Sequence, residues 1–297
     1  MARSTPPRPQ ADPTVPLWPS GGPRQPRRRV SVDGRFGRLF LVVLVLLLGA
    51  GAIVMLAFLG RTPPPPPRGP SGPPPFVVPQ LDVRPRAAVP DPASAIPAPE
   101  VPVVPPRQTF QGWVTYLSSV TDVPPRVLTA YARATLAIGA SAPGCHLSWT
   151  TLAAVGRIES RHGRYGGNEV ADNGRERKPL IGPTLDGSPG VLAVPDTDRG
   201  VLDGDPVWDH AIGPMQFTPQ TWRRWGVRVS GDGAEPDPQN VDDASNAAAR
   251  YLCAVGGDLA VPANWWTAVL SYNNSTEYGQ SVFSSAEAYG KVSLGAN

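Results

Sequence analysis

Residues 148–163 read SWTTLAAVGRIESRHG, a pattern typical of a helix packed inside a protein. Ser148 is a favourable N-cap and Gly163 a favourable C-cap, so we expect the helix to run between them. Apolar residues at helical spacing recur in three later segments, at 241–255, at 265–272 and around 282–289. Strand patterns are short or absent, so the sequence predicts a mainly α-helical domain.

The acidic residue of the first stretch, Glu159, has two interpretations. At about 100° per residue it falls within about 20° of Leu152 in the apolar stripe, whereas Arg157 and Arg161 fall on the opposite face, which we expect to be solvated. A helical glutamate is usually an exposed surface residue, and this interpretation stays open. Against an apolar wall, however, a carboxyl loses hydration, which raises its pKa and keeps it protonated near neutral pH. A protonated carboxyl in a cleft is the group that donates a proton to a glycosidic oxygen.

Most glycosidases pair such an acid with a second carboxylate at a defined separation. Five aspartates are available, but no motif singles one out: Asp196, Asp198, Asp203, Asp205 and Asp209. A route with one acid therefore stays open, and it suits a substrate whose own N-acetyl group assists. These aspartates lie in the segment 163–210, which is rich in Gly, Pro and Asp. A loop of that length in a compact domain is usually functional or mobile.

We expect no cofactor. Residues 196–205 have the aspartate density of a calcium loop, but Gly200 stands where a fifth ligand belongs and no glutamate closes the loop. The four candidate ligands are Asp196, Asp198, Asp203 and Asp205. The alternative, which we favour, is a solvated loop of turns. Glu159 and His162 have the spacing of half a di-iron motif without a second copy. We expect His162 instead to cap the helix C-terminus, where positive charge is favoured.

Residues 39–59 read LFLVVLVLLLGAGAIVMLAFL and are long enough to span a bilayer as one helix, at about 1.5 Å per residue. A cleaved signal peptide is the alternative, but its apolar core has roughly 7 to 15 residues and no convincing cleavage site follows here. Six arginines lie between positions 24 and 38. By the positive-inside rule, residues 1–38 then form a disordered basic tail in the cytoplasm, and the rest of the chain lies outside the cell membrane.

Residues 60–106 form the next expected segment, a linker with eighteen prolines between positions 62 and 106. In polyproline II form those positions would span at most about 140 Å, as a semi-rigid spacer. A docking site for a proline-reading module is the alternative. The folded domain is expected at 107–297. Because this part carries fifteen basic and nineteen acidic residues, its charge argues against nucleic acid as a partner.

The two cysteines, Cys145 and Cys253, both fall in the part expected to be exported, where disulfides persist. We expect a bridge between them. Two buried free thiols are the alternative, because sequence alone gives no distance between the residues.

The stretch GRIESRHG (156–163) resembles the catalytic-glutamate motif of the lytic murein transglycosylases, specifically their membrane-bound B-type branch. Three further segments support the resemblance in the order found in the family: AIGPMQFTPQTW (211–222), NVDDASNAAARYLC (240–253) and LSYNNSTEYGQSV (270–282). The first 106 residues carry no part of it.

The resemblance implies a lysozyme-like helical domain that cleaves the β-1,4 bond between N-acetylmuramic acid and N-acetylglucosamine in peptidoglycan. Family members use no water, because the C6 hydroxyl of the muramoyl residue attacks the anomeric carbon and leaves a 1,6-anhydro end. Glu159 matches the acid that protonates the leaving oxygen and then accepts the hydroxyl proton. The residues implied to bind or orient the sugar are Ser160, Gln216, Tyr272 and Asn273.

The resemblance implies peptidoglycan strands and the membrane as partners, and it allows other cell-wall enzymes in the same machine. Two alternatives stay open: a wall-binding module without turnover, and a muramidase that uses water and leaves reducing ends. The presence of Glu159 and Gln216 argues against the first, because a relative without turnover tends to lose its acid.

Overall fold

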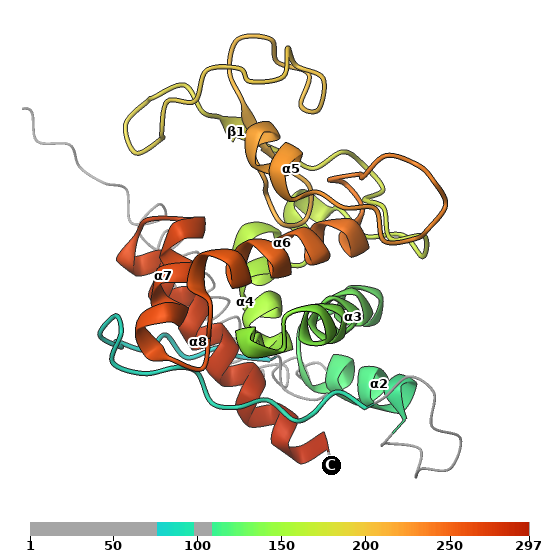
Figure 1. Ribbon diagram of the computed structural model, residues 1–297, viewed down its shortest axis with the longest axis vertical. Helices are drawn as coiled ribbons and strands as arrows, with labels where there is room; N and C mark the ends of the chain where they lie inside the picture. The colour runs from blue at the N-terminus through green and yellow to red at the C-terminus, as the bar shows by residue number, and fades with distance from the viewer. Residues whose placement is uncertain (1–75, 98–108, 297) are drawn as a thin grey trace, which may run out of the picture. The chain divides into compact units, whose positions relative to one another are not determined.

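The computed structural model of the chain describes residues 76–97 and 109–296. In these ranges the chain forms seven α-helices: α2 (Phe110–Val120), α3 (Pro125–Ser141), α4 (Trp149–Ser160), α5 (Pro219–Trp225), α6 (Val241–Gly256), α7 (Pro262–Tyr272) and α8 (Thr276–Ser293). Strands β1 (Ile181–Thr184) and β2 (His210–Ile212) form one antiparallel pair. Three short 3-10 turns complete the set: η2 (Pro143–Cys145), η3 (Tyr165–Gly167) and η4 (Leu294–Ala296). The described part is mainly α-helical, as predicted (Figure 1).

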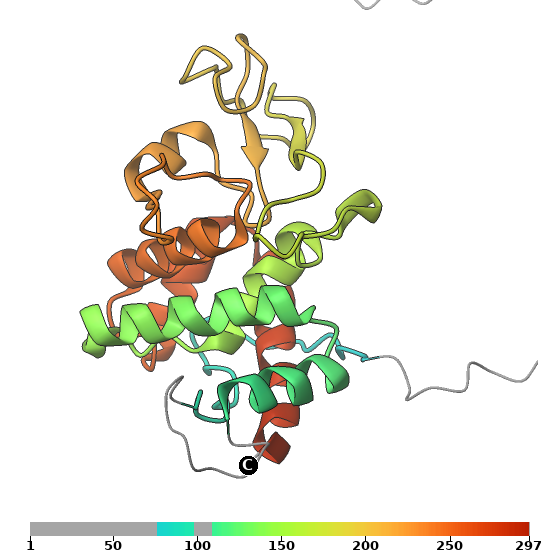
Figure 2. The ribbon, with the colours of Figure 1, turned by 90° about the vertical axis from the view of Figure 1, so that its right-hand side faces the viewer.

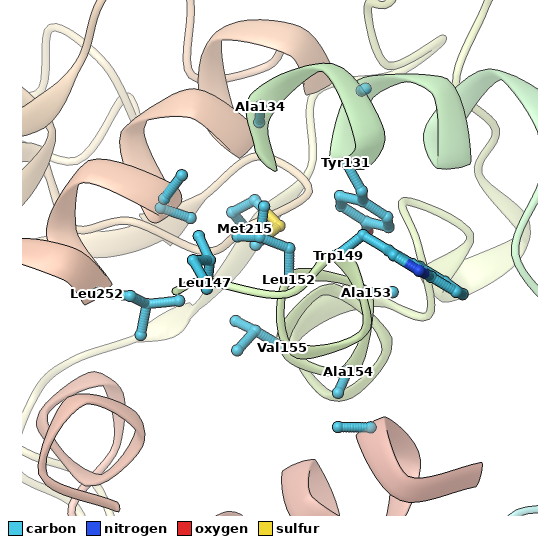
Figure 3. Close-up of a cluster of buried hydrophobic side chains, with 14 of the residues drawn as sticks. Tyr131, Ala134, Leu147, Trp149, Leu152, Ala153, Ala154, Val155, Met215 and Leu252 are labelled. Atoms are coloured by element: carbon cyan, nitrogen blue, oxygen red, sulfur yellow. The ribbon is translucent and has the colours of Figure 1, made fainter. Parts of the chain in front are cut away.

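Helix α4 is the centre of the helical part. Every residue from Trp149 to Gly156 is buried, so the helix is packed on all sides rather than along one stripe. It packs most extensively against α8, and also against α3 and α6. Figure 3 shows side chains of α4, among them Leu152 and Val155, packed beside Met215 and Tyr131. The predicted start is confirmed, because Ser148 Oγ accepts the N–H of Thr151.

The end of α4 differs from the prediction. The helix ends at Ser160, and three residues with positive φ follow: Arg161 at 53°, His162 at 62° and Gly163 at 77°. A left-handed C-cap was expected only at Gly163. Two side-chain-bearing residues adopt this conformation first, which costs about 1–2 kcal/mol for each. The surrounding contacts must therefore hold the turn.

The other predicted helices are confirmed as α6, α7 and α8. Asn240 caps α6, since its Oδ1 accepts the N–H groups of Asp242 and Asp243. The predicted disulfide is also confirmed: Cys145 in η2 is bonded to Cys253 in α6, with their Cα atoms 5.5 Å apart.

Residues 76–97, here called the N-terminal strap, run along α8 without helix or strand and make one turn at 84–87 (Figure 1). Side chains of α8 accept backbone N–H groups of the strap in three places: Ser284 from Leu81 at 2.9 Å, Glu287 from Asp91 at 2.6 Å and Ser293 from Ser94 at 2.9 Å. The strap is therefore part of the folded domain. The predicted boundary at 107, with all of 60–106 as a spacer, was wrong for these residues.

Composition alone did not show this docking. A proline-rich segment is extended whether or not it is packed. Here its N–H groups find acceptors on a helix, and Gly290 of α8 lets the carbonyl of Asp91 approach. A Cβ at Gly290 would lie 2.5 Å from that oxygen.

Residues 161–240 contain most of the loops and lie at one end of the helical part in both views (Figures 1 and 2). Only β1, β2, η3 and α5 interrupt them. Over 76–97 and 109–296, no helix is long and apolar enough to cross a membrane. The predicted tail at 1–38 and transmembrane helix at 39–59 lie outside the described residues.

Candidate active site

Glu159 lies in the last turn of α4, where it is partly exposed. Its Oε1 accepts a hydrogen bond of 2.5 Å from the hydroxyl of Tyr278, in the first turn of α8. Burial raises the pKa of Glu159 to about 7, and the hydrogen bond from Tyr278 opposes that rise. Near neutral pH this carboxyl is therefore both a proton donor and, once ionised, a proton acceptor.

Ser160, the next residue, ties α4 to the loop 213–217. Its Oγ donates to the carbonyl of Pro214 at 2.6 Å and accepts the N–H of Gly163 at 2.7 Å. The side chain is only 1% exposed, so it does not lie where a sugar would contact it. Its contacts instead hold the loop against the turn that follows Glu159.

Tyr272, at the end of α7, holds the same loop from the other side. Its hydroxyl donates to the carbonyl of Met215 at 2.8 Å. Burial and the nearby charge of Glu159 raise the pKa of Tyr272 well above its usual value, so the phenol stays a donor. The loop is thus held between Ser160, beside the acid, and Tyr272.

Gln216 has a backbone φ of 49°, in the left-handed region that non-glycine residues rarely adopt. Its Nε2 donates to the carbonyl of Gly213 at 2.9 Å. A Cβ at Gly182 of β1 would lie 2.7 Å from the Oε1 of Gln216, so this strand approaches the glutamine closely because it has no side chain there. Strained residues of this kind are concentrated at functional sites, where the surrounding structure holds them.

Asn273 is exposed at the C-terminal end of α7. Its backbone carbonyl accepts the N–H of Ser275 at 2.9 Å. Within the described residues its side-chain amide makes no hydrogen bond, which leaves the amide accessible to a ligand. Of the predicted residues, Gln216 and Tyr272 therefore meet at the loop 213–217, whereas Asn273 lies at the surface.

A buried polar chain lies beside the turn after α4. The hydroxyl of Tyr289 donates to Asp122 Oδ1 at 2.6 Å and lies 3.0 Å from His162 Nε2. Because Tyr289 donates to the carboxylate, it accepts from Nε2. The hydroxyl of Tyr131 lies 3.2 Å from His162 Nδ1. Burial lowers the pKa of His162, and the hydrogen bond and charge of Asp122 oppose that shift. His162 thus lies inside a buried polar chain rather than at an exposed helix end.

Arg157 also differs from the prediction. Its guanidinium forms an ion pair with Asp122, and the side chains of the pair are only 25% and 26% exposed. Burial alone would raise the pKa of Asp122, but His162, Tyr289 and Arg157 outweigh it and hold the pKa well below its usual value. The face opposite Glu159 is thus covered at Arg157 by the turn at Asp122, whereas Arg161 is exposed, as expected.

Residues 145–292 match the family described as Transglycosylase SLT domain. We refer to these residues, 145–292, as the SLT domain. The SLT domain contains Glu159, Gln216, Tyr272 and Asn273. The strap and helices α2 and α3 precede it in the chain. The predicted enzyme class is confirmed: this chain is a lytic transglycosylase.

A solved structure similar to the chain is the Escherichia coli lytic transglycosylase Slt35 in complex with bulgecin A. The two are 15% identical, the match covers 61% of this chain and 79% of that chain, and the TM-score is 0.37. No curated protein matches the chain significantly.

Tyr278 is the residue of the SLT domain that sequence reasoning missed. It lies within the quoted segment 270–282, but only Tyr272 and Asn273 were singled out there. A signal was available, because Tyr278 precedes Val282 by one helical turn and so shares its buried face. A buried tyrosine normally finds a hydrogen-bond partner for its hydroxyl. In the SLT domain that partner is Glu159.

The carboxylates of the aspartates in 196–205 accept backbone N–H groups from turns of their own loop. Asp196 accepts the N–H groups of residues 198, 199 and 200, and Asp198 accepts those of 201 and 202. Asp203 and Asp205 likewise accept N–H groups within 205–210. Oxygens of Asp196, Asp198 and Asp209 do lie within 4.8 Å of one another. The turns explain the aspartate density, so we assign no metal site to it.

Proposed function

We propose that this enzyme cleaves the β-1,4 bond between N-acetylmuramic acid and N-acetylglucosamine and leaves a 1,6-anhydro end on the muramoyl product. The observation that carries the proposal is the protonation behaviour of Glu159, whose pKa burial raises to about 7. In the proposed reaction Glu159 serves both proton transfers, and a pKa near neutrality suits both.

The two transfers balance without water. Glu159 first donates its proton to the glycosidic oxygen as the bond from that oxygen to the muramoyl anomeric carbon breaks. The resulting carboxylate then accepts the proton of the C6 hydroxyl as its oxygen bonds to the same carbon. Glu159 ends protonated, and the masses of the two fragments add up to that of the intact strand.

The substrate would lie against the loop 213–217 and the end of α7. Gln216 has its strained backbone there, and the accessible amide of Asn273 supplies both a donor and an acceptor for sugar hydroxyl and N-acetyl groups. Ser160 and Tyr272 support this surface from behind through the carbonyls of Pro214 and Met215.

The proposal includes a place of action. We place the domain outside the cell membrane, anchored by residues 39–59 as in the B-type branch, with a role in cell-wall remodelling. The disulfide between Cys145 and Cys253 supports export, because such bonds persist in oxidising compartments.

The test uses the full chain in detergent and its Glu159→Gln variant, each incubated with purified peptidoglycan. Soluble fragments that are one water lighter than hydrolysis products, and absent with the variant, are expected by mass spectrometry. Fragments with reducing ends would identify a hydrolytic muramidase instead. Binding to the wall without soluble fragments would identify a wall-binding module and contradict the proposed reaction.

A further inference from the structure

The strap begins with an aromatic contact. The ring of Phe76 stacks on the ring of Tyr289, with centroids 5.2 Å apart and planes 5° from parallel. The guanidinium of Arg157 lies over the ring of Phe76, 5.8 Å from the centroid of that ring. Phe76 thus touches one residue of α8 and one residue of α4. It lies 69 positions before the first residue of the SLT domain match.

Both partners of Phe76 hold the C-terminal turn of α4. Arg157 forms an ion pair with Asp122, in the turn between α2 and α3. Tyr289 is fully buried and contacts Asp122 and His162 through its hydroxyl. Phe76 therefore covers the place where Arg157, Asp122 and Tyr289 meet.

Arg157 and His162 stand on either side of Glu159 in the chain. The backbone between them leaves the helix through left-handed residues at Arg161 and His162, a conformation that persists only where contacts hold it. The N–H of His162 also donates to the carbonyl of Gly156 at 2.9 Å. Contacts that fix the positions of Arg157 and His162 therefore also fix the direction in which the side chain of Glu159 projects from the last turn of α4.

We propose that Phe76 is a positioning residue for Glu159, acting through Arg157 and Tyr289. The inference rests on the proposed function and extends it to a residue outside the family domain. Without the ring, the guanidinium of Arg157 loses a cation–π contact and water reaches the Asp122 pair. A single cation–π contact of this kind is weak compared with the stability of a domain, so its loss would loosen one turn without unfolding the chain.

The test compares four full-length proteins in detergent: wild type, Phe76→Ala, Phe76→Tyr and Val77→Ala. Val77 is the neighbouring strap residue and is 70% exposed, which makes it a matched control. The substrate is a soluble oligomer of alternating N-acetylmuramic acid and N-acetylglucosamine, and kcat, KM and the thermal midpoint are measured. We expect Phe76→Ala to lower kcat about tenfold or more, because small misplacement of a catalytic group has large effects on rate. KM should stay within about twofold, since the sugar-facing loop 213–217 is unchanged.

Phe76→Tyr keeps the ring and should restore kcat, and Val77→Ala should behave as wild type. A Phe76→Ala chain with the kcat of wild type overturns the inference, as does a loss of kcat no larger than its loss of folded protein. If Phe76→Ala does not fold, Phe76→Leu replaces it, because leucine keeps apolar volume without the stack. Wild-type kcat in that variant overturns the inference and a lowered kcat supports it. An inactive wild-type chain instead contradicts the proposed function itself.

Discussion

The hydroxyl of Tyr278 lies 2.5 Å from Oε1 of Glu159 and joins the first turn of α8 to the last turn of α4. These two helices pack against each other more extensively than any other pair. The hydrogen bond is therefore held by the core of the domain and not by a mobile loop. Tyr278 sets both the orientation of the acid and, by favouring its charged form, part of its pKa.

Replacing Tyr278 by phenylalanine should shift the pH dependence of the enzyme. The hydrogen bond lowers the pKa of Glu159, so its loss raises that pKa above the wild-type value of about 7. Glu159 donates its proton in the first step, and kcat is lost as pH rises through its pKa. The high-pH limb of kcat should therefore move upward by about one to two pH units, since hydrogen bonds to charged groups contribute about 1.5–3 kcal/mol. Measuring kcat between pH 5 and 9 checks this, with the exposed Tyr165→Phe as control. An unmoved limb would mean that Tyr278 does not tune the acid.

Replacing Ser160 by alanine should destabilise the loop 213–217 without shifting the high-pH limb of kcat. The carbonyl of Pro214 and the N–H of Gly163 would lose their buried partner, at a cost of about 1–3 kcal/mol. We expect a lower urea midpoint and a lower kcat, because the loop 213–217 is no longer tied to α4. Ser141→Ala, at the exposed end of α3, removes only hydrogen bonds to the carbonyls of Ala137 and Ile138 in its own helix and should be nearly neutral. Equal effects of the two substitutions would contradict the assigned role.

Two glycine-to-alanine changes should have opposite effects on stability. A Cβ at Gly156 would lie 2.0 Å from the hydroxyl of Tyr131 and 3.2 Å from Met215 Sδ. Overpacking of this kind costs typically about 1–3 kcal/mol. Gly139, in the exposed face of α3, has nothing within 4 Å of its added Cβ, and alanine there should stabilise the helix by up to about 1 kcal/mol. Urea unfolding of both variants checks the pair, and a stable Gly156→Ala chain would show that Tyr131 can move aside.

Removing the disulfide should lower stability through the unfolded state. Cys145 and Cys253 are 108 residues apart, and a cross-link over such a loop stabilises by at most about 4–5 kcal/mol. We expect the Cys145→Ser, Cys253→Ser double variant to lose about 2–4 kcal/mol of unfolding free energy. Reductant should lower the urea midpoint of wild type to that of the double variant and leave the variant unchanged. A wild-type midpoint that reductant does not alter would argue against this stabilisation.

Helix starts could be predicted because their caps are local. Ser148 and Asn240 each accept N–H groups two or three residues further on, so short stretches of sequence define both. The end of α4 could not be predicted in this way, since steric contacts disfavour left-handed backbone at residues such as Arg161 and His162. That turn depends on Tyr131 and Tyr289, which lie far away in the chain.

The site shows the same division. The apolar stripe placed Glu159 against the core, which needs only the period of a helix. The partner of its carboxyl could not be derived in this way, because it depends on how α8 crosses α4. The same holds for the strap, whose proline content predicts extended backbone but says nothing of the α8 side chains that accept its N–H groups.

The docked strap also bears on which part of the wall the enzyme can reach. With residues 76–97 held on α8, the stretch left to separate the domain from the proposed anchor is 60–75. Fully extended in polyproline II form, those residues would span about 50 Å, roughly a third of the length first expected. If residues 39–59 anchor the domain as proposed, an active site on so short a tether would reach only the glycan strands near the bilayer. Strands farther from the bilayer than the tether allows would lie beyond its range.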